Sequence, residues 1–242
     1  MSPFRSLAAS SLSLFFLCAA AAAQLPGEVL WHQKISASKG NGPMGIKQND
    51  QFARGAAVIG DLDLDGVPDL AVGALGDDDN TGNDAMDYGA CWILFMNTNG
   101  TVKSHYKISR TAAALPLDPG DEFGRAVREL GDFDLDGVPD VMVSADKDDD
   151  NGTDKGAFYI LFLNRDGTVK AWKKISETVG GFHGDLDPSD LFGRGLRNIG
   201  DLDLDGVPDI GAGAVWDDDG GSNRGAYWIL FMKRDGTVKS WN

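Results

Sequence analysis

Apolar and polar residues alternate in short blocks along most of the chain. In the middle of the sequence, the apolar blocks fall at 124–130, 140–145, 157–164 and 168–176. The third block, Ala-Phe-Tyr-Ile-Leu-Phe-Leu-Asn, is a continuous apolar run of strand length, which is typical of a strand buried on both faces. The Asp166-Gly167 step before the fourth block predicts a hairpin turn, because glycine readily adopts positive φ. No helical period is sustained, so the pattern predicts strands.

These blocks belong to a unit of roughly 70 residues that occurs three times. Each unit has a phenylalanine before an acidic loop, then a Gly-Ala pair that opens an apolar run, then a Gly-Thr-Val-Lys turn. The phenylalanines are Phe52, Phe123 and Phe192, the Gly-Ala pairs begin at Gly89, Gly156 and Gly225, and the turns begin at Gly100, Gly167 and Gly236. Four antiparallel strands per unit, stacked on like neighbours, describe the blade of a β-propeller. The sequence therefore predicts an all-β fold, a β-propeller-type array of three four-stranded antiparallel blades.

The phase of the repeat predicts how the chain is divided. Residues 30–36 align with 170–176, the fourth block of the second unit, so we expect an extra outer strand before the first blade. Propellers have about 4–8 blades, and unclosed blades leave exposed edges. We therefore expect an incomplete propeller: part of a longer array, an incomplete gene model or half of an oligomeric ring. The predicted divisions are a secretory signal at 1–23, an outer strand and linker at 24–50, and blades at 51–120, 121–188 and 189–242, the last truncated in its final strand.

The start of the chain predicts export. A basic beginning, a short apolar core and the small residues Ala21, Ala22 and Ala23 are together typical of a cleaved secretory signal. The apolar run is short for a membrane span, so we expect a protein that is secreted or held at the cell surface. Cys18 would leave with the signal, so only one thiol, Cys91, would remain, and we expect no internal disulfide. Cys91 lies in an apolar run, and we expect it to pack as a small buried hydrophobic residue. The net charge of −15 and the lack of a basic stripe disfavour nucleic acid as a partner.

The most unusual polar pattern is a nine-residue loop, Asp-x-Asp-x-Asp-Gly-Val-Pro-Asp, which occurs once in each unit. Carboxylates at alternate positions are typical of a site for a hard cation, and calcium tolerates such a flexible shell better than magnesium does. The loop contains no His or Cys, which argues against zinc or copper. We expect about three calcium ions, one per repeat, held by the four carboxylates and the valine carbonyl of each loop. The predicted ligands are Asp61, Asp63, Asp65, Val67 and Asp69; Asp132, Asp134, Asp136, Val138 and Asp140; and Asp201, Asp203, Asp205, Val207 and Asp209.

The order of residues within the loop predicts their roles. The carboxylates turn toward the ion, while Phe133 and Leu135 turn away and pack. Gly137, at position six, permits a sharp turn. An EF-hand loop needs glutamate at its twelfth position. Here that position holds Val72, Val143 and Ala212.

On these residues, the chain resembles the FG-GAP repeats of integrin alpha-chain β-propellers over about residues 51–242. Phe123-Gly124 and Phe192-Gly193 match the FG element, whereas the first unit has Phe52-Ala53. The GAP element is degenerate and lacks its proline: it reads Gly73-Ala74-Leu75, Ser144-Ala145-Asp146 and Gly213-Ala214-Val215. The resemblance implies calcium in the loops between the first and second strands of each blade, and a ligand-binding face on the opposite side.

Three more acidic runs follow the second strand of each unit, at 77–79, 148–150 and 217–219. We favour a solvated, solubilising tip for these runs. The alternative is a second, weaker cation site or a contact that a cation bridges to a partner.

The leading hypothesis is an extracellular adhesion or recognition module in which calcium is structural and the ligand is an unidentified protein or glycan. A calcium-dependent hydrolase or lyase is the first alternative. His32, His105 and His183 lie in unequal contexts, and no catalytic motif accompanies them, so we expect no enzymatic activity. A purely structural surface protein is the second alternative.

Overall fold

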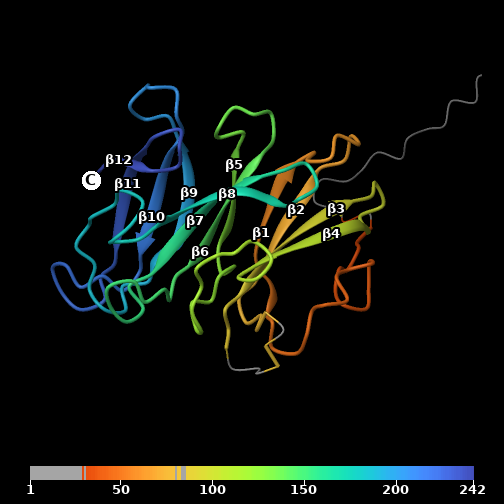
Figure 1. Ribbon diagram of the computed structural model, residues 1–242, viewed down its shortest axis with the longest axis horizontal. Coiled ribbons are helices and arrows are strands. Elements are labelled where there is room, and N and C mark those ends of the chain that lie inside the picture. Colours follow the sequence, from red (N-terminus) through yellow and green to blue (C-terminus); the bar gives the residue numbers. More distant parts are fainter. Residues whose placement is uncertain (1–28, 30, 80, 83–85) are drawn as a thin grey trace, which may run out of the picture. The chain divides into compact units, whose positions relative to one another are not determined.

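The computed structural model describes residues 29, 31–79, 81–82 and 86–242 (Figure 1). The predicted secretory signal lies outside these residues. Residues 33–242 form one compact unit. Its regular structure consists of three four-stranded antiparallel sheets, which confirms the predicted all-β architecture. Within the described ranges, no helix has the length and apolar character that crossing a membrane requires.

Each sheet is built from four strands that follow one another along the chain (Figure 1). The first contains β1 (Phe52–Gly60), β2 (Asp69–Ala74), β3 (Ala90–Met96) and β4 (Val102–Ser109); the second contains β5 (Val127–Gly131), β6 (Asp140–Ala145), β7 (Ala157–Leu163) and β8 (Val169–Ile175); the third contains β9 (Phe192–Gly200), β10 (Asp209–Ala214), β11 (Ala226–Met232) and β12 (Val238–Trp241). The predicted block 140–145 coincides with β6. The strand expected from residue 124 begins at Val127. Phe123 makes an isolated bridge to Gly89, the residue before β3.

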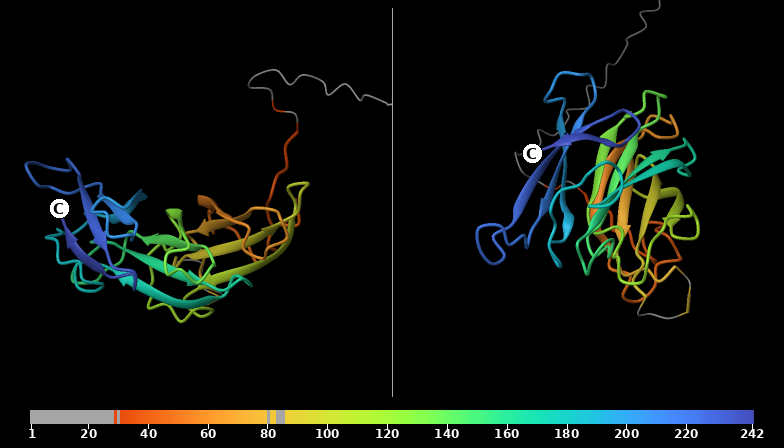
Figure 2. Two further views of the ribbon diagram at one scale, coloured as in Figure 1. Left: turned by 90° about the horizontal axis from the view of Figure 1, so that it is seen from above. Right: turned by 60° about the vertical axis from the view of Figure 1, so that its left-hand side comes forward.

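Neighbouring sheets stack face to face through two apolar cores, and β1, β5 and β9 lie next to one another in that order (Figure 2). The first core joins alternate residues of β3 to alternate residues of β7: Cys91, Ile93 and Phe95 with Tyr159, Leu161 and Leu163. The second core joins the other face of β7 to β11: Phe158, Ile160 and Phe162 with Leu230 and Met232. Both β3 and β7 are buried along their whole length, as predicted for a third strand covered on both sides.

The third sheet leaves one face open. Tyr227 of β11 is 54% exposed, whereas Cys91 and Phe158, at the same position in β3 and β7, are fully buried. The three sheets do not close on one another, which agrees with an incomplete propeller. That a longer array or a second copy of the chain covers this face stays a prediction.

The extra outer strand expected at 30–36 does not form in the described part of that range. Residues 33–35 have no regular structure, and Ser36 makes only an isolated bridge to Lys39. An outer strand needs a third strand with a free edge, and β3 already pairs with β4. The segment instead packs Ile35 against the face of the first sheet that carries Val72 and Leu94.

Cys91 is free and fully buried, as predicted. Burial raises the pKa of its thiol to about 12. The side chain therefore acts as a small apolar residue of the first core, and cross-links contribute nothing among the described residues.

The burial pattern predicts unequal effects for two aligned aromatic side chains. Phe158→Ala should lower the free energy of unfolding by about 3–5 kcal/mol because it opens a cavity in the second core. Tyr227→Ala should lower it by less than about 1 kcal/mol, since half of that side chain already meets solvent. Urea unfolding followed by tryptophan fluorescence would measure both. Equal losses would show that the face carrying Tyr227 is covered in solution.

Candidate metal centres

The nine-residue loops join β1 to β2, β5 to β6 and β9 to β10. At position six, the glycines have left-handed backbone angles, with φ of 89° at Gly66, 86° at Gly137 and 88° at Gly206. A side chain is disfavoured in this conformation, which confirms the predicted sharp turn. The leucine at position four is also left-handed, with φ of 65° at Leu135.

The two apolar residues of the second loop behave differently. Phe133 is fully buried, as predicted, but Leu135 is 67% exposed, so the expectation that it packs is wrong. The left-handed backbone at position four turns the side chain toward solvent. Leu64 and Leu204, at the same position of the other loops, are 66% and 86% exposed.

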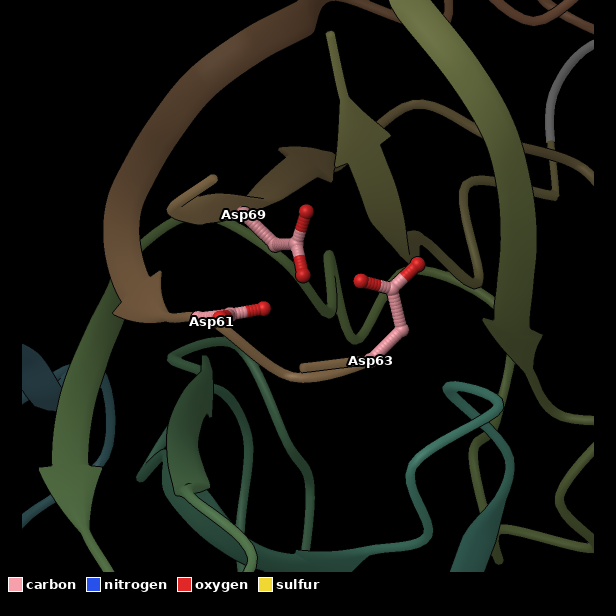
Figure 3. Close-up of side chains that lie close together, drawn as sticks. All are labelled: Asp61, Asp63 and Asp69. Carbon is pink, nitrogen blue, oxygen red and sulfur yellow. The ribbon is translucent and has the colours of Figure 1, made fainter. Parts of the chain in front are cut away.

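The carboxylates of each loop converge. In the first loop, oxygens of Asp61, Asp63 and Asp69 lie within 4.8 Å of one another and face a common space between the end of β1 and the start of β2 (Figure 3). The corresponding groups are Asp132, Asp134 and Asp136 in the second loop and Asp201, Asp203 and Asp209 in the third. Three of the predicted carboxylate ligands fall outside these groups: Asp65, Asp140 and Asp205.

The last carboxylate of each loop also holds the backbone together. Asp140 is fully buried, and its two oxygens accept the N–H groups of Phe133 at 3.0 Å and Leu163 at 3.1 Å. Asp69 and Asp209 make the same two bonds, to Leu62 and Met96 and to Leu202 and Met232. Each of these side chains thereby links the loop to the end of the third strand of its own blade. The sequence pattern did not reveal this structural role.

The first and fifth positions shape the turn. Asp61 accepts the N–H groups of Asp65 at 3.0 Å and Gly66 at 2.8 Å, and Asp65 accepts that of Val67 at 2.9 Å. The valine side chains pack against the apolar clusters of the sheets. That the carbonyls of Val67, Val138 and Val207 bind the ion stays a prediction.

A lysine from the outer strand reaches every loop. Lys103 Nζ lies 2.5 Å from Asp63 Oδ2 and also pairs with Asp65. Lys170 pairs in the same way with Asp134 and Asp136, and Lys239 with Asp203 and Asp205. These lysines were not among the predicted site residues, although the repeated Gly-Thr-Val-Lys turn marked their positions.

Two arginines connect neighbouring loops. Arg165 donates to the carbonyl of Gly137 in its own blade at 2.7 Å and to that of Leu62 in the preceding blade at 3.4 Å. Arg234 repeats this arrangement with Gly206 and Phe133. The loops are therefore fastened to one another as well as to their own sheets.

The donor atoms suit a hard divalent cation. The converging atoms are all carboxylate oxygens, the ligands that such ions prefer. Asp63 Oδ1 is buried and has no hydrogen-bond partner in the described structure, and a buried polar atom in that state is stabilised by coordinating an ion. The residues best placed to hold one are the three carboxylates that converge in each loop.

The acidic runs after each second strand are not simply solvated. Their first residues, Asp77, Asp148 and Asp217, are each 2–3% exposed, so the expected solvated tip is wrong for these side chains. Each accepts the N–H of the residue two positions later, at 2.8–3.0 Å. Lys107 pairs with Asp77, and Lys174 pairs with Asp148. For Asp77 and Asp148, the short turn and the lysine together compensate for the burial.

Comparison with known proteins identifies relatives of this repeat, although no family model matches the chain. The chain is 28% identical over 176 residues to integrin alpha pat-2 of Caenorhabditis elegans, which covers 69% of the chain and 14% of that protein. It is 32% identical over 159 residues to integrin alpha-2 of Mus musculus, covering 64% of the chain and 12% of the relative.

These relatives confirm the resemblance of the chain to the FG-GAP repeats of integrin alpha chains. It spans about a seventh of the length of the integrin alpha relatives that it matches. A further relative is phosphatidylinositol-glycan-specific phospholipase D of Bos taurus, which is 27% identical over 173 residues, covering 70% of the chain and 19% of that protein.

The positions of the FG and GAP elements can be compared between the repeats. Gly124 has a φ of 104°, and a β-carbon there would lie 2.3 Å from the carbonyl oxygen of Ala90 in the preceding blade. Ala53 takes the same position in the first repeat with a φ of 71°. Asp146, which stands in place of the GAP proline, is fully buried between Arg125 and Arg194 at 2.8 and 2.6 Å and so joins the second blade to the third.

The double hydrogen bond of Asp140 predicts a large loss of stability when it is removed. In EDTA, Asp140→Ala should lower the free energy of unfolding by about 2–5 kcal/mol because two buried N–H groups lose their acceptor. Asp136→Ala, in the same loop but exposed, should cost less than about 1 kcal/mol. Denaturant titration of both variants measures the difference. Similar losses would contradict the structural role of the ninth position.

The burial of Asp121, before the first strand of the second blade, predicts that the free energy of unfolding depends on pH. Burial, reinforced by Asp148, raises its pKa to about 8. Because its pKa is raised in the folded state, protonated Asp121 contributes fully to the free energy of unfolding below its unfolded pKa of about 4. This contribution is lost as the pH rises toward 8, by up to about 1.4 kcal/mol per pH unit. Asp121→Asn should therefore lose less stability than the unaltered chain between pH 5 and pH 8.5 in urea titrations. Parallel losses would show that Asp121 is ionised throughout.

Proposed function

We propose that this chain is an extracellular calcium-binding module for adhesion or recognition, in which calcium is structural. The observation that supports this most directly is the convergence of three carboxylates in each of the three loops. The relationship to integrin alpha chains supports an extracellular location and a recognition role.

Calcium is the ion that the loops suit best. They offer several carboxylates on a flexible turn, a shell that calcium tolerates and that magnesium, with its strict octahedron, does not favour. In each loop the ion would be held by the three converging carboxylates, with the fourth carboxylate and the valine carbonyl completing the shell. These three are Asp61, Asp63 and Asp69 in the first loop, Asp132, Asp134 and Asp136 in the second, and Asp201, Asp203 and Asp209 in the third. The ion would offset the mutual repulsion of these carboxylates and tie the end of the first strand to the start of the second.

The recognition surface would lie at the opposite ends of the strands, where the acidic runs and the linkers before each first strand are found. An extracellular protein or glycan is the proposed class of ligand. Asp77 and Asp148 are engaged by lysines there, which leaves the exposed Asp149, Asp218 and Asp219 to meet a partner.

We propose that the chain is not an enzyme, although one relative is a phospholipase D by name. His105 packs edge-on against Trp92 with ring centroids 5.3 Å apart, and His183 packs against Trp241 at 6.0 Å. Both histidines are thus engaged with aromatic rings on different blades. This arrangement favours a packing role over a catalytic one.

Isothermal titration calorimetry with calcium tests the proposal. We expect about three ions per chain and a higher melting temperature in calcium than in EDTA. The gain should be about 2.7–4.1 kcal/mol per site when free calcium is 100 to 1,000 times its dissociation constant. Magnesium at equal concentration should stabilise the protein less. No calcium uptake by the folded chain would overturn the assignment.

A variant that neutralises the third position in each loop, Asp63→Asn with Asp134→Asn and Asp203→Asn, provides the matched comparison. It should lose calcium uptake while staying folded in EDTA, because the ninth-position carboxylates remain. Protein and glycan arrays probed with the unaltered chain and this variant, with and without calcium, then separate recognition from a purely structural role. Calcium-dependent capture by the unaltered chain alone is the expected result.

A further inference from the structure

One basic side chain contacts the acidic loop in every blade, and it does so through the same pair of carboxylates. Lys103, Lys170 and Lys239 each bond the third and fifth positions of the loop, with Nζ to oxygen distances of 2.5 Å to Asp63, 2.8 Å to Asp134 and 2.5 Å to Asp203. The third-position oxygen in each pair is Oδ2, and so is the fifth-position oxygen. Three independent copies of one geometry indicate a built feature of the repeat.

The contact orients the third-position carboxylate. With Oδ2 of Asp63 held by Lys103, Oδ1 is buried and has no hydrogen-bond partner in the described structure. Asp63 also belongs to the converging group with Asp61 and Asp69. The lysine thus acts on a carboxylate that contributes to the candidate ion site.

The same contact occupies the fifth-position carboxylate. Asp65 uses Oδ1 to accept the N–H of Val67 and Oδ2 to bind Lys103, and Asp205 does the same with Val207 and Lys239. An ion that recruits the fifth position, as the sequence predicts, must therefore draw an oxygen away from the lysine.

We propose that Lys103, Lys170 and Lys239 are resident counter-ions of the three loops, which keep the loops folded without a divalent ion and weaken the binding of one. This inference rests on the proposed calcium function. Each lysine reduces the formal charge of its four-carboxylate loop from −4 to −3 and competes with the ion for the fifth-position oxygen. The lysines are positioning residues that set how tightly the loops hold calcium.

Two measurable quantities should therefore move in opposite directions when the lysines are removed. Without the positive charge, the carboxylates repel each other more strongly, so the melting temperature in EDTA should fall. Without the competitor, calcium should bind more tightly, because repulsion between a single charge and a nearby divalent ion in a water-like dielectric corresponds to about a factor of ten.

The experiment compares the full chain with the variant Lys103→Met, Lys170→Met and Lys239→Met. Calcium affinity is measured by competition with a chromophoric chelator, and melting temperature is measured in EDTA and in saturating calcium. We expect the variant to bind calcium about tenfold more tightly, to melt lower in EDTA, and to match or exceed the unaltered chain in calcium.

Two control variants make the outcome specific. Lys34→Met with Lys39→Met and Lys47→Met removes the same net charge from exposed lysines outside the loops, and it should leave the calcium affinity within about twofold of the unaltered chain. Lys103→Arg with Lys170→Arg and Lys239→Arg keeps the charge and should keep the affinity.

The outcomes distinguish this inference from the proposed function. Unaltered protein that takes up no calcium overturns the proposed function, and the inference with it. Unaltered protein that binds calcium, beside a loop-lysine variant with unchanged or weaker affinity, overturns the inference alone. Equal tightening in the loop variant and the exposed-lysine variant would show that net charge, not contact with the loop, is responsible.

Discussion

The structure depends on how the negative charge of three short acidic loops is compensated. Each loop places four carboxylates within nine residues, and unscreened charges of one sign at such spacing repel strongly. The chain answers with several kinds of partner. Backbone N–H groups bind the first, fifth and ninth carboxylates, and a lysine binds the third and fifth. In each loop, oxygens of three carboxylates also converge on a space that suits a divalent cation. The turn between the first two strands of every blade is organised by these bonds.

The carboxylates of one motif therefore have different roles. Asp140 and its counterparts are structural first, because both of their oxygens are engaged by buried backbone groups. Asp63 is the side chain most available to an ion, because its Oδ1 has no hydrogen-bond partner in the described structure. The carboxylates look equivalent in the sequence, but in the structure some of them mainly hold the turn and others mainly face the ion site. Ion binding is therefore added to a turn that already has its own hydrogen bonds.

Neighbouring blades are also joined by contacts that recur along the repeat. β3 and β7 each have two apolar faces that enter different cores, so a blade gains stability from neighbours on both of its sides. Arg165, Arg234 and Asp146 add polar links from blade to blade. Both arginines donate to backbone carbonyls of the acidic loops. An ion bound in one loop would therefore lie near the contacts that join that loop to the next blade. The open face of the third sheet shows what the repeat looks like when no neighbour covers it.

Much of this was determined by the sequence alone. The repeat, the strands, the glycine at the sixth loop position and the set of acidic residues follow from local preferences and from a pattern that occurs three times, and local preferences act within a few residues. Other features depend on contacts between residues that are distant in the chain. The lysine that enters each loop is 34–40 residues away from it, and the arginines reach back about 100 residues. The burial of Asp77 depends on the segments that pack around it, including Lys107 of β4. The exposure of Leu135 follows from its left-handed backbone angle. Such contacts form only when the sheets stack, so the sequence could specify the acidic loop but only the tertiary structure could decide which of its oxygens remain free.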